Sequence, residues 1–543
     1  MTENMKNNIN TLIIIPRYNL TNEINYRYAF PLGLSFISAA LKQAGFHVDC
    51  LNLNHCKGHI NTIVSDSLSK KAYSYVGTGS NSLLYDVIEK ILNTVREHPS
   101  RPKIVLGGPI ITSEPETIFN ALNPDYAVIG EGEKTIVELL EYIEYGKNIE
   151  EVKGIGYRDN DGKAIFTLRR DAIEDLDALP FPDFEGIGFK KQLAHMYTNN
   201  DYINNVSDSP RVYPLLASRG CPFKCTFCYH YEMYRARSMD SIMEELRLAV
   251  NAYGINIISI FDECFSIKKG RISEFCERVK KLQKELSCDL KWSCQMTVNS
   301  VDKDILEQMK EAGCDSISYG FESYSPVVLR SMHKPVTAEQ IDKAFHETLD
   351  AGIAVQANFI FGDVAETLET ATHTLNYWKE KCKGQVNLDF IQPYPGSEIY
   401  NHCLRKGLIT DKLDFIKNHI ASGTTFNMTD KMTDEEFKQL KKDVFDAESK
   451  YREQVRPLSV NKMRDRIYSF KVKCPYCSKT TVYKNCYVKN RFTYGFNIVC
   501  RNCHMRFFVV SLVQKIAYSH YSKIRDIRVF QKSLLKRIKK KLQ

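Results

Sequence analysis

The chain has 543 residues, of which 43% are hydrophobic and 26% charged, and its mean hydropathy is −0.33. These values are typical of globular proteins and argue against a membrane protein, and the length predicts several domains instead of one core. The net charge of +9 equals the excess of basic residues in 511–543 alone. An electrostatic contact with a membrane or a nucleic acid is therefore expected only from this tail.

The N-terminus shows no export signal. Its apolar run ends at Pro16, far short of a signal-peptide core or a spanning helix, so we expect a cytoplasmic protein. In a reducing compartment the 17 cysteines are not expected to form disulfides. Their spacing is therefore examined for metal sites.

Short apolar strands alternate with amphipathic helices in residues 1–150. The first helix is expected to open at Pro31 and close at Gly45, and strands are expected at 11–16, 46–53, 73–78, 103–106 and 126–129. This pattern predicts an α/β, doubly wound, Rossmann-like parallel sheet. The ligand of such a sheet lies beyond the carboxyl ends of the strands. Glycines that would allow close backbone approach follow these ends: Gly77, Gly79, Gly107, Gly108, Gly130 and Gly132.

A linker and a second α/β domain are expected next. The turn Asn160-Asp161-Gly162 predicts a hairpin, and together with the segment 176–183 it is assigned to a linker over residues 151–205. Six strands are then expected to end near Ser218, Asp262, Thr297, Phe321, Phe361 and Pro393. They predict a partial (β/α)6 barrel over residues 206–430, with its active face at the carboxyl ends. A helical extension is expected over 431–470.

Three cysteines lie close together in the loop after the first barrel strand. Cys221, Cys225 and Cys228 fall within eight residues. Three thiolates cannot saturate a four-iron cluster, so one iron would stay open to chelate an amine and a carboxylate. The alternative is a zinc knuckle with His230 as the fourth ligand.

The spacing Cys221-x3-Cys225-x2-Cys228, with Phe227 before the third cysteine, resembles the signature of the radical S-adenosylmethionine (SAM) superfamily. The resemblance implies a [4Fe–4S] cluster whose open iron chelates SAM, with Phe227 beside the adenine. It also implies a 5′-deoxyadenosyl radical, formed with an electron donor such as flavodoxin or ferredoxin. Other strand ends resemble cofactor-binding segments of the family: Asp262 and Glu263 for the amino group, and Glu322 and Ser323 for the methionine moiety.

The first domain resembles the cobalamin-binding half of class B radical SAM methyltransferases. The resemblance rests on Gly107-Gly108-Pro109 and on Gly130-Glu131-Gly132-Glu133 after consecutive strands. It implies that cobalamin contacts Glu131 and the six glycines named above. No histidine occurs in residues 17–30, so cobalamin is expected without a histidine below the metal, and His55 is interpreted as a loop histidine. The alternative is a domain that has lost its cofactor.

A second group of cysteines forms two C-x2-C pairs within residues 471–510. Cys474 and Cys477 are separated by 22 residues from Cys500 and Cys503, a pattern typical of a ribbon that binds structural zinc. An auxiliary iron–sulfur cluster is the rival. Cys486 is interpreted as a spare thiol. The tail 511–543 predicts a basic amphipathic helix, either on a membrane or RNA or packed on its own domain.

The combined motifs predict a cobalamin-dependent radical SAM enzyme that methylates an unactivated carbon or phosphorus of a small-molecule or lipid-like metabolite. One alternative keeps the cofactors but carries out a cyclisation, rearrangement or oxidation without methyl transfer. Another is a nucleic-acid-binding zinc-ribbon protein with a vestigial barrel. A tRNA methylthiotransferase is disfavoured because the N-terminal region holds only Cys50 and Cys56, where that class has three cysteines.

Overall fold

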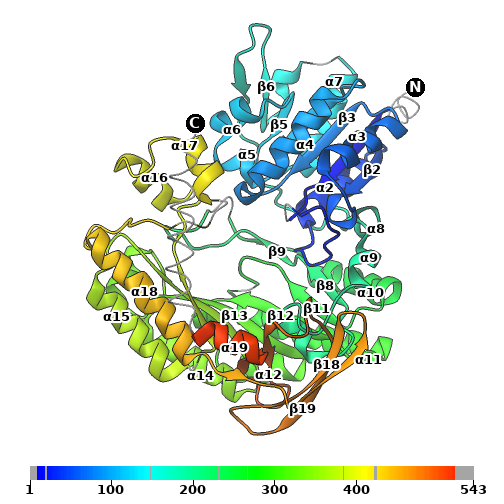
Figure 1. The fold of residues 1–543 in the computed structure, drawn as a ribbon. Coiled ribbons are helices and arrows are strands. Elements are labelled where there is room, and N and C mark those ends of the chain that lie inside the picture. Colours follow the sequence, from blue (N-terminus) through cyan, green and yellow to red (C-terminus); the bar gives the residue numbers. More distant parts are fainter. Residues whose placement is uncertain are drawn as a thin grey trace.

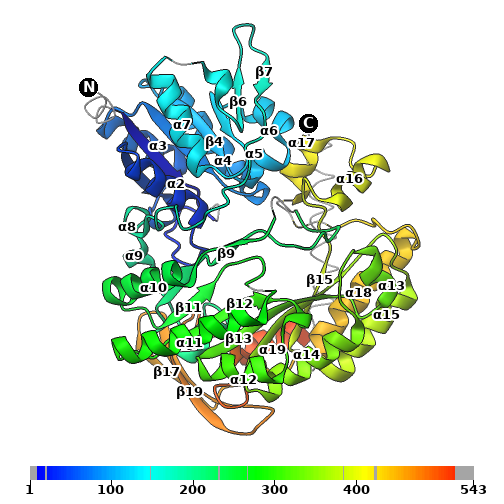
Figure 2. The same ribbon diagram turned by 180° about the vertical axis from the view of Figure 1, so that it is seen from behind.

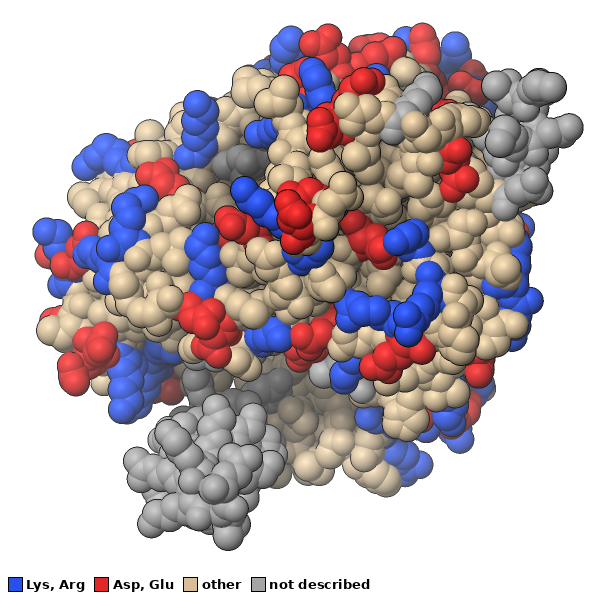
Figure 3. Space-filling model, turned by 90° about the horizontal axis from the view of Figure 1, so that it is seen from above, with Lys and Arg blue, Asp and Glu red and all other residues tan. Residues whose placement is uncertain are grey.

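A computed structural model describes the chain in three stacked parts: an upper α/β domain, a central barrel and a lower β-sheet module (Figure 1). The described residues are 9–18, 21–146, 148–229, 233–265, 267–382, 384–420, 423 and 425–519. Within them, no helix combines the length and apolar character needed to cross a membrane. Basic and acidic side chains are intermixed on the face seen from above (Figure 3), which agrees with a near-neutral body.

The upper sheet has seven strands in the described part of the chain, in the order β2-β1-β3-β4-β5-β6-β7. The first five are parallel: β1 (Asn10–Ile15), β2 (His47–Asn52), β3 (Tyr75–Gly79), β4 (Lys103–Gly107) and β5 (Tyr126–Val128). The hairpin that we assigned to the linker instead extends this sheet as antiparallel strands β6 (Ile155–Arg158) and β7 (Ala164–Phe166). Ile155 and Tyr157 of the hairpin are buried beside β5, so the hairpin belongs to the sheet and not to a linker.

Alternation along β1 determines which helices cover each face of this sheet. Ile13 and Ile15 pack with α2 (Leu32–Gln43) and α7 (Glu133–Glu144). Leu12 and Ile14 point to the other face, in the cluster formed with α3 (Ile60–Lys70), α4 (Tyr85–Glu97), α5 (Pro109–Ser113) and α6 (Pro115–Leu122). Both faces of the sheet are therefore covered, as expected for a parallel sheet.

The central domain confirms the predicted partial barrel. Its six described strands are all parallel and follow the order β15-β14-β13-β12-β11-β8. They are β8 (Val212–Leu215), β11 (Ile257–Ile260), β12 (Lys291–Met296), β13 (Cys314–Glu322), β14 (Ala354–Phe361) and β15 (Val386–Phe390). The helices outside it, seen from behind in Figure 2, include α10 (Met239–Tyr253), α11 (Lys269–Leu286), α12 (Lys303–Glu311), α14 (Ala338–Asp350) and α15 (Leu368–Tyr377).

Shorter elements connect these parts. A ribbon of β9 (Ser218–Arg219) and β10 (Arg235–Ala236) flanks the three-cysteine loop. The remaining helices of this region are α8 (Phe184–Ile187), α9 (Phe189–Leu193), α13 (Pro326–Ser331), α16 (Glu398–Arg405), α17 (Lys412–Asp414) and α18 (Asp434–Tyr451). The predicted helical extension to residue 470 therefore ends early. Helix α18 ends at Tyr451, where Arg452 turns to an extended conformation, and the chain continues as strands from Gln454.

The C-terminal module packs two three-stranded sheets around its own core. One sheet holds β17 (Ser459–Arg464), β18 (Ile467–Lys473) and β19 (Thr480–Tyr487), and the other holds β16 (Gln454–Val455), β20 (Gly495–Val499) and β21 (Arg506–Val510). Phe470, Tyr483 and Ile498 are buried between them. Helix α19 (Leu512–Ser519) follows, and the rest of the predicted amphipathic tail lies outside the described residues.

Candidate active site between the two α/β domains

A cavity of about 670 Å³ lies where the carboxyl ends of the upper sheet face the mouth of the barrel. It continues between the upper sheet and its helices, where Thr11 and Tyr75 face Leu41 and Leu140. The barrel side contributes Leu216, Ser218, Arg219, Gly220, Arg235, Phe261 and Glu263. One cavity is therefore shared by the two domains, and its upper part is an apolar slot.

All six glycines expected at the strand ends line this cavity, and so does Glu131. They are glycines for different reasons. A Cβ at Gly79 would lie 2.4 Å from the carbonyl oxygen of Gly107, and Gly108 has a φ of +84°, which side chains rarely adopt. A Cβ at Gly107 would meet no atom closer than 3.9 Å. Among the six strand-end glycines, Gly107 is thus a position with room for a side chain.

Glu131 makes ion pairs across the domain boundary. Its carboxylate accepts hydrogen bonds from Arg235 at 2.9 and 3.0 Å and from Arg219 at 3.2 Å, and Glu133 also pairs with Arg219. Burial would raise the pKa of Glu131, but the hydrogen bonds from Arg235 and from the Ile173 N–H hold this pKa below its ordinary value. The two arginines were not identified from the sequence, because ordinary basic residues near a loop carry no specific signal.

The three-cysteine loop begins directly after Arg219 and Gly220. Cys225 is buried, and its carbonyl accepts a hydrogen bond from the Cys228 N–H at 3.1 Å. Burial and the neighbouring Cys225 raise the pKa of the Cys228 thiol to about 12.

The three thiols of this loop do not gather at the spacing of the ligands of a single ion. Among the described residues, only the C-terminal cysteines form a group of ligand atoms all within 4.8 Å of one another. A four-iron cluster binds each thiolate through a different iron, so its ligands lie farther apart than those of one ion. His230, the candidate fourth zinc ligand, lies outside the described residues. Phe227 packs against the apolar cluster that contains Val328 and Met332.

A buried ion pair lies beside the three thiols. Lys334 Nζ is 2.9 Å from Glu322 Oε1, and the two side chains are only 12% and 10% exposed. Burial would lower the pKa of Lys334, but the attraction of Glu322 and then Cys225 raises this pKa. Lys334 was not identified from the sequence, because α13 separates it from Glu322. Ser323 is fully buried and its hydroxyl contacts Thr374 at 3.2 Å.

The adjacent acids at the end of β11 lie in different surroundings. Asp262 is buried and accepts hydrogen bonds from the Ala217 N–H at 2.7 Å and the Ser218 hydroxyl at 2.6 Å. Burial raises the pKa of Asp262 to about 7, although these hydrogen bonds oppose the shift. Glu263 instead lines the cavity. Asp262 therefore holds the segment before the cysteine loop, and Glu263 is the acid that a ligand can reach.

Histidine does not contribute to the described lining of the cavity. His55 lies away from it, with Nε2 2.8 Å from the Tyr28 hydroxyl. Burial, reinforced by Lys191, lowers the pKa of His55 to about 4. These contacts agree with its interpretation as a loop histidine.

Two known domain types match the chain. Residues 215–377 match the radical SAM superfamily, and residues 26–140 match the B12 binding domain. The first match contains the three-cysteine loop, and the second contains all six strand-end glycines that line the cavity.

Several known proteins are similar to the chain over both regions. An uncharacterized methyltransferase of Pyrococcus horikoshii is 28% identical over 339 residues, which cover 61% of this chain and 69% of the relative. An anaerobic magnesium-protoporphyrin IX monomethyl ester cyclase of Rubrivivax gelatinosus is 27% identical, over 60% of this chain and 58% of the relative. The radical SAM methyltransferase TsrM of Kitasatospora setae, solved with cobalamin and a [4Fe–4S] cluster, aligns with a TM-score of 0.58 and 16% identity, over 73% of this chain and 75% of TsrM.

Proposed function

The chain is a radical SAM enzyme with a B12-binding domain, and we propose that it transfers a methyl group to a small-molecule substrate. The observation that carries the proposal is the shared cavity. The strand-end glycines of the B12-binding domain and Arg219, Gly220 and Glu263 of the radical SAM domain line one space. A methyl donor held above and a radical generator held below would therefore meet the same substrate.

The upper wall fits cobalamin. The open space at Gly107 and the apolar slot between the sheet and α2 and α7 suit a flat macrocycle with a slender tail. When bound, the cluster and SAM supply a radical that activates the substrate, and cobalamin supplies the methyl group.

The barrel side of the cavity and the cysteine loop that follows Gly220 fit SAM and its cluster. Cys221, Cys225 and Cys228 would hold the cluster, and Glu263 would accept the cofactor ammonium. Lys334 places a positive charge beside the thiolates, where it offsets their negative charge in a dry environment. Glu322 holds the Lys334 ammonium group in this position. Asp262 positions Ala217 and Ser218, which precede the cysteine loop.

A second candidate function follows from the cyclase relative. The same cofactors could drive a cyclisation, rearrangement or oxidation without methyl transfer. The substrate is proposed to be a small or lipid-like metabolite, and a flavodoxin or ferredoxin is proposed as the electron donor.

The test is product analysis of the full chain, reconstituted anaerobically with iron, sulfide and cobalamin and supplied with SAM and a panel of candidate metabolites. Methyl transfer should consume two SAM molecules per turnover and give 5′-deoxyadenosine and S-adenosylhomocysteine in about equal amounts. Converted substrate with 5′-deoxyadenosine but no S-adenosylhomocysteine would favour the second candidate. Replacing Cys221, Cys225 and Cys228 by alanine should abolish 5′-deoxyadenosine formation, and persistent formation would refute both candidates.

A further inference from the structure

Four thiols meet in the C-terminal module, far from the shared cavity. Cys474 and Cys477 lie in the turn between β18 and β19, and Cys500 and Cys503 lie in the turn between β20 and β21. Their four sulfur atoms all lie within 4.8 Å of one another. Cys474 Sγ is 3.6 Å from Cys503 Sγ, and Cys477 Sγ is 3.8 Å from Cys500 Sγ. Each sheet of the module thus contributes one pair of ligands to a single point.

We infer that these four cysteines bind one Zn²⁺ ion, which fastens the module across the amino end of the barrel. A tetrahedral zinc site with Zn–S bonds of about 2.3 Å separates its sulfurs by about 3.8 Å, which is the spacing found here. An auxiliary four-iron cluster would hold the sulfurs farther apart, because each thiolate binds its own iron. Four thiolates also fill the zinc coordination shell, so the ion has a structural role.

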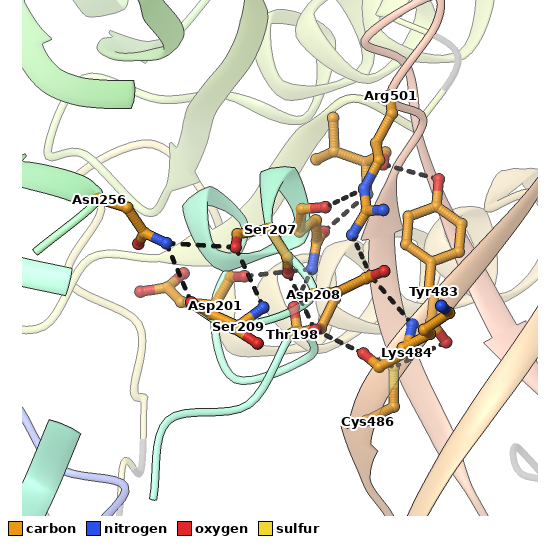
Figure 4. Close-up of polar contacts among 12 residues, drawn as sticks. Thr198, Asp201, Ser207, Asp208, Ser209, Asn256, Tyr483, Lys484, Cys486 and Arg501 are labelled. Atoms are coloured by element: carbon orange, nitrogen blue, oxygen red, sulfur yellow. Dashed lines mark hydrogen bonds and ion pairs between the residues drawn. The ribbon is translucent and has the colours of Figure 1, made fainter. Parts of the chain in front are cut away.

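The turn that holds Cys500 and Cys503, together with β19, joins the module to the segment before β8. Arg501, between its two cysteines, donates to the Asn205 carbonyl at 2.7 Å and to Asp208 at 2.7 Å. The Lys484 N–H also donates to Asp208 at 3.0 Å, and the Lys484 carbonyl accepts from the Thr198 hydroxyl (Figure 4). The position of the turn between Cys500 and Cys503 therefore determines whether Arg501 can reach Asn205 and Asp208.

The contacts continue around the start of the barrel. The Arg506 N–H donates to Gln385 Oε1 at 2.5 Å, and the buried Arg506 guanidinium donates to the Gly384 and Gln385 carbonyls immediately before β15. His504 lies 3.8 Å from Asp315 at the start of β13. All these partners lie at the amino ends of barrel strands. The module thus closes the barrel end opposite the cavity.

Loss of zinc should loosen this closure while the three-cysteine loop at the other end keeps its cluster. The matched control is Cys486, a buried thiol of the same module whose sulfur lies 3.7 Å from the Lys484 carbonyl and outside the four-cysteine group. Cys503→Ser should lose the zinc of the full chain, and Cys486→Ala should retain it. Cys503→Ser should also be cleaved faster by protease in residues 452–458, which contain β16 and connect α18 to the rest of the module.

Metal analysis of the anaerobically purified full chain tests the assignment. We expect one zinc per chain in addition to cluster iron; iron in place of this zinc, or no metal at the site, would overturn it. Retention of zinc by Cys503→Ser would also overturn it, and zinc loss without faster cleavage would overturn the fastening role. If Cys503→Ser does not accumulate, the wild-type chain tests the assignment instead. Its metal content and the thiolate charge-transfer bands of the Co²⁺-substituted chain should then show one four-thiolate site. None of these measurements depends on methyl transfer or cobalamin.

Discussion

The Arg235 guanidinium of β10 donates two parallel hydrogen bonds, of 2.9 and 3.0 Å, to the Glu131 carboxylate in the loop after β5. This fork joins the radical SAM domain to the B12-binding domain at the edge of their shared cavity. The Glu131 and Arg235 side chains are only 12% and 13% exposed. The pair therefore fixes the relative position of the two domains in surroundings where water screens it weakly.

Replacing Glu131 by alanine should destabilise the chain by about 3 kcal/mol, because Arg235 would keep its charge in a buried position without its bidentate partner. Thermal or urea unfolding of the full chain measures the change. The control is Glu285→Ala, which removes an exposed ion pair with Arg247 and should leave stability unchanged. Equal stability of the two variants would show that Glu131 does not hold the domains together.

The contribution of Glu131 should depend on pH in a defined direction. Its pKa in the folded chain lies below the ordinary value of 4.5, so the carboxylate stabilises the fold fully above pH 4.5. The contribution should be lost as pH falls further, through the folded pKa. The stability difference between wild type and Glu131→Gln should therefore be constant near neutrality and shrink below pH 4.5. A difference that grows with acidity would contradict this ion-pair role.

Gly107→Val should exclude cobalamin and leave the fold intact, because the new side chain would extend from an unstrained position into the cavity. Gly108→Val is the comparison. At its φ of +84° and ψ of −179°, a region almost confined to glycine, a side chain costs about 1–3 kcal/mol, so this variant should lose stability as well as cobalamin. Bound cobalamin is measured by absorbance after gel filtration, and stability by thermal unfolding. Normal cobalamin binding by Gly107→Val would show that the strand-end glycines do not form the cobalamin site.

Lys334→Gln should make the cluster harder to reduce, because a nearby positive charge favours the more negative, reduced state. Its loss also leaves the Glu322 carboxylate without its partner. A redox titration of the reconstituted chain, followed by electron paramagnetic resonance, should show a more negative midpoint potential. Lys343→Gln, on the exposed side of α14, is the control and should leave the potential unchanged. An unchanged potential in Lys334→Gln would place this charge too far from the cluster to matter.

Local spacing in the sequence determined both cysteine sites and the order of strands and helices. Three thiols within eight residues remain neighbours in any compact loop, and two C-x2-C pairs predict turns that can share one ion. The period of the apolar residues distinguished strands from helices, which led to the doubly wound sheet and the partial barrel. Glycines after parallel strands likewise marked one edge of a sheet, because all parallel strands end on the same side.

Tertiary structure alone decided which distant residues meet. Arg235 and Glu131 are 104 positions apart, and only the docking of two domains brings them together. Asp262 and Glu263 are adjacent and chemically alike, yet packing buries one among N–H and O–H donors and turns the other into the cavity. The sequence of the C-terminal module does not indicate which surface of the other domains it packs against. Its place at the amino end of the barrel follows from long-range hydrogen bonds such as Arg501 to Asp208, which no local spacing encodes.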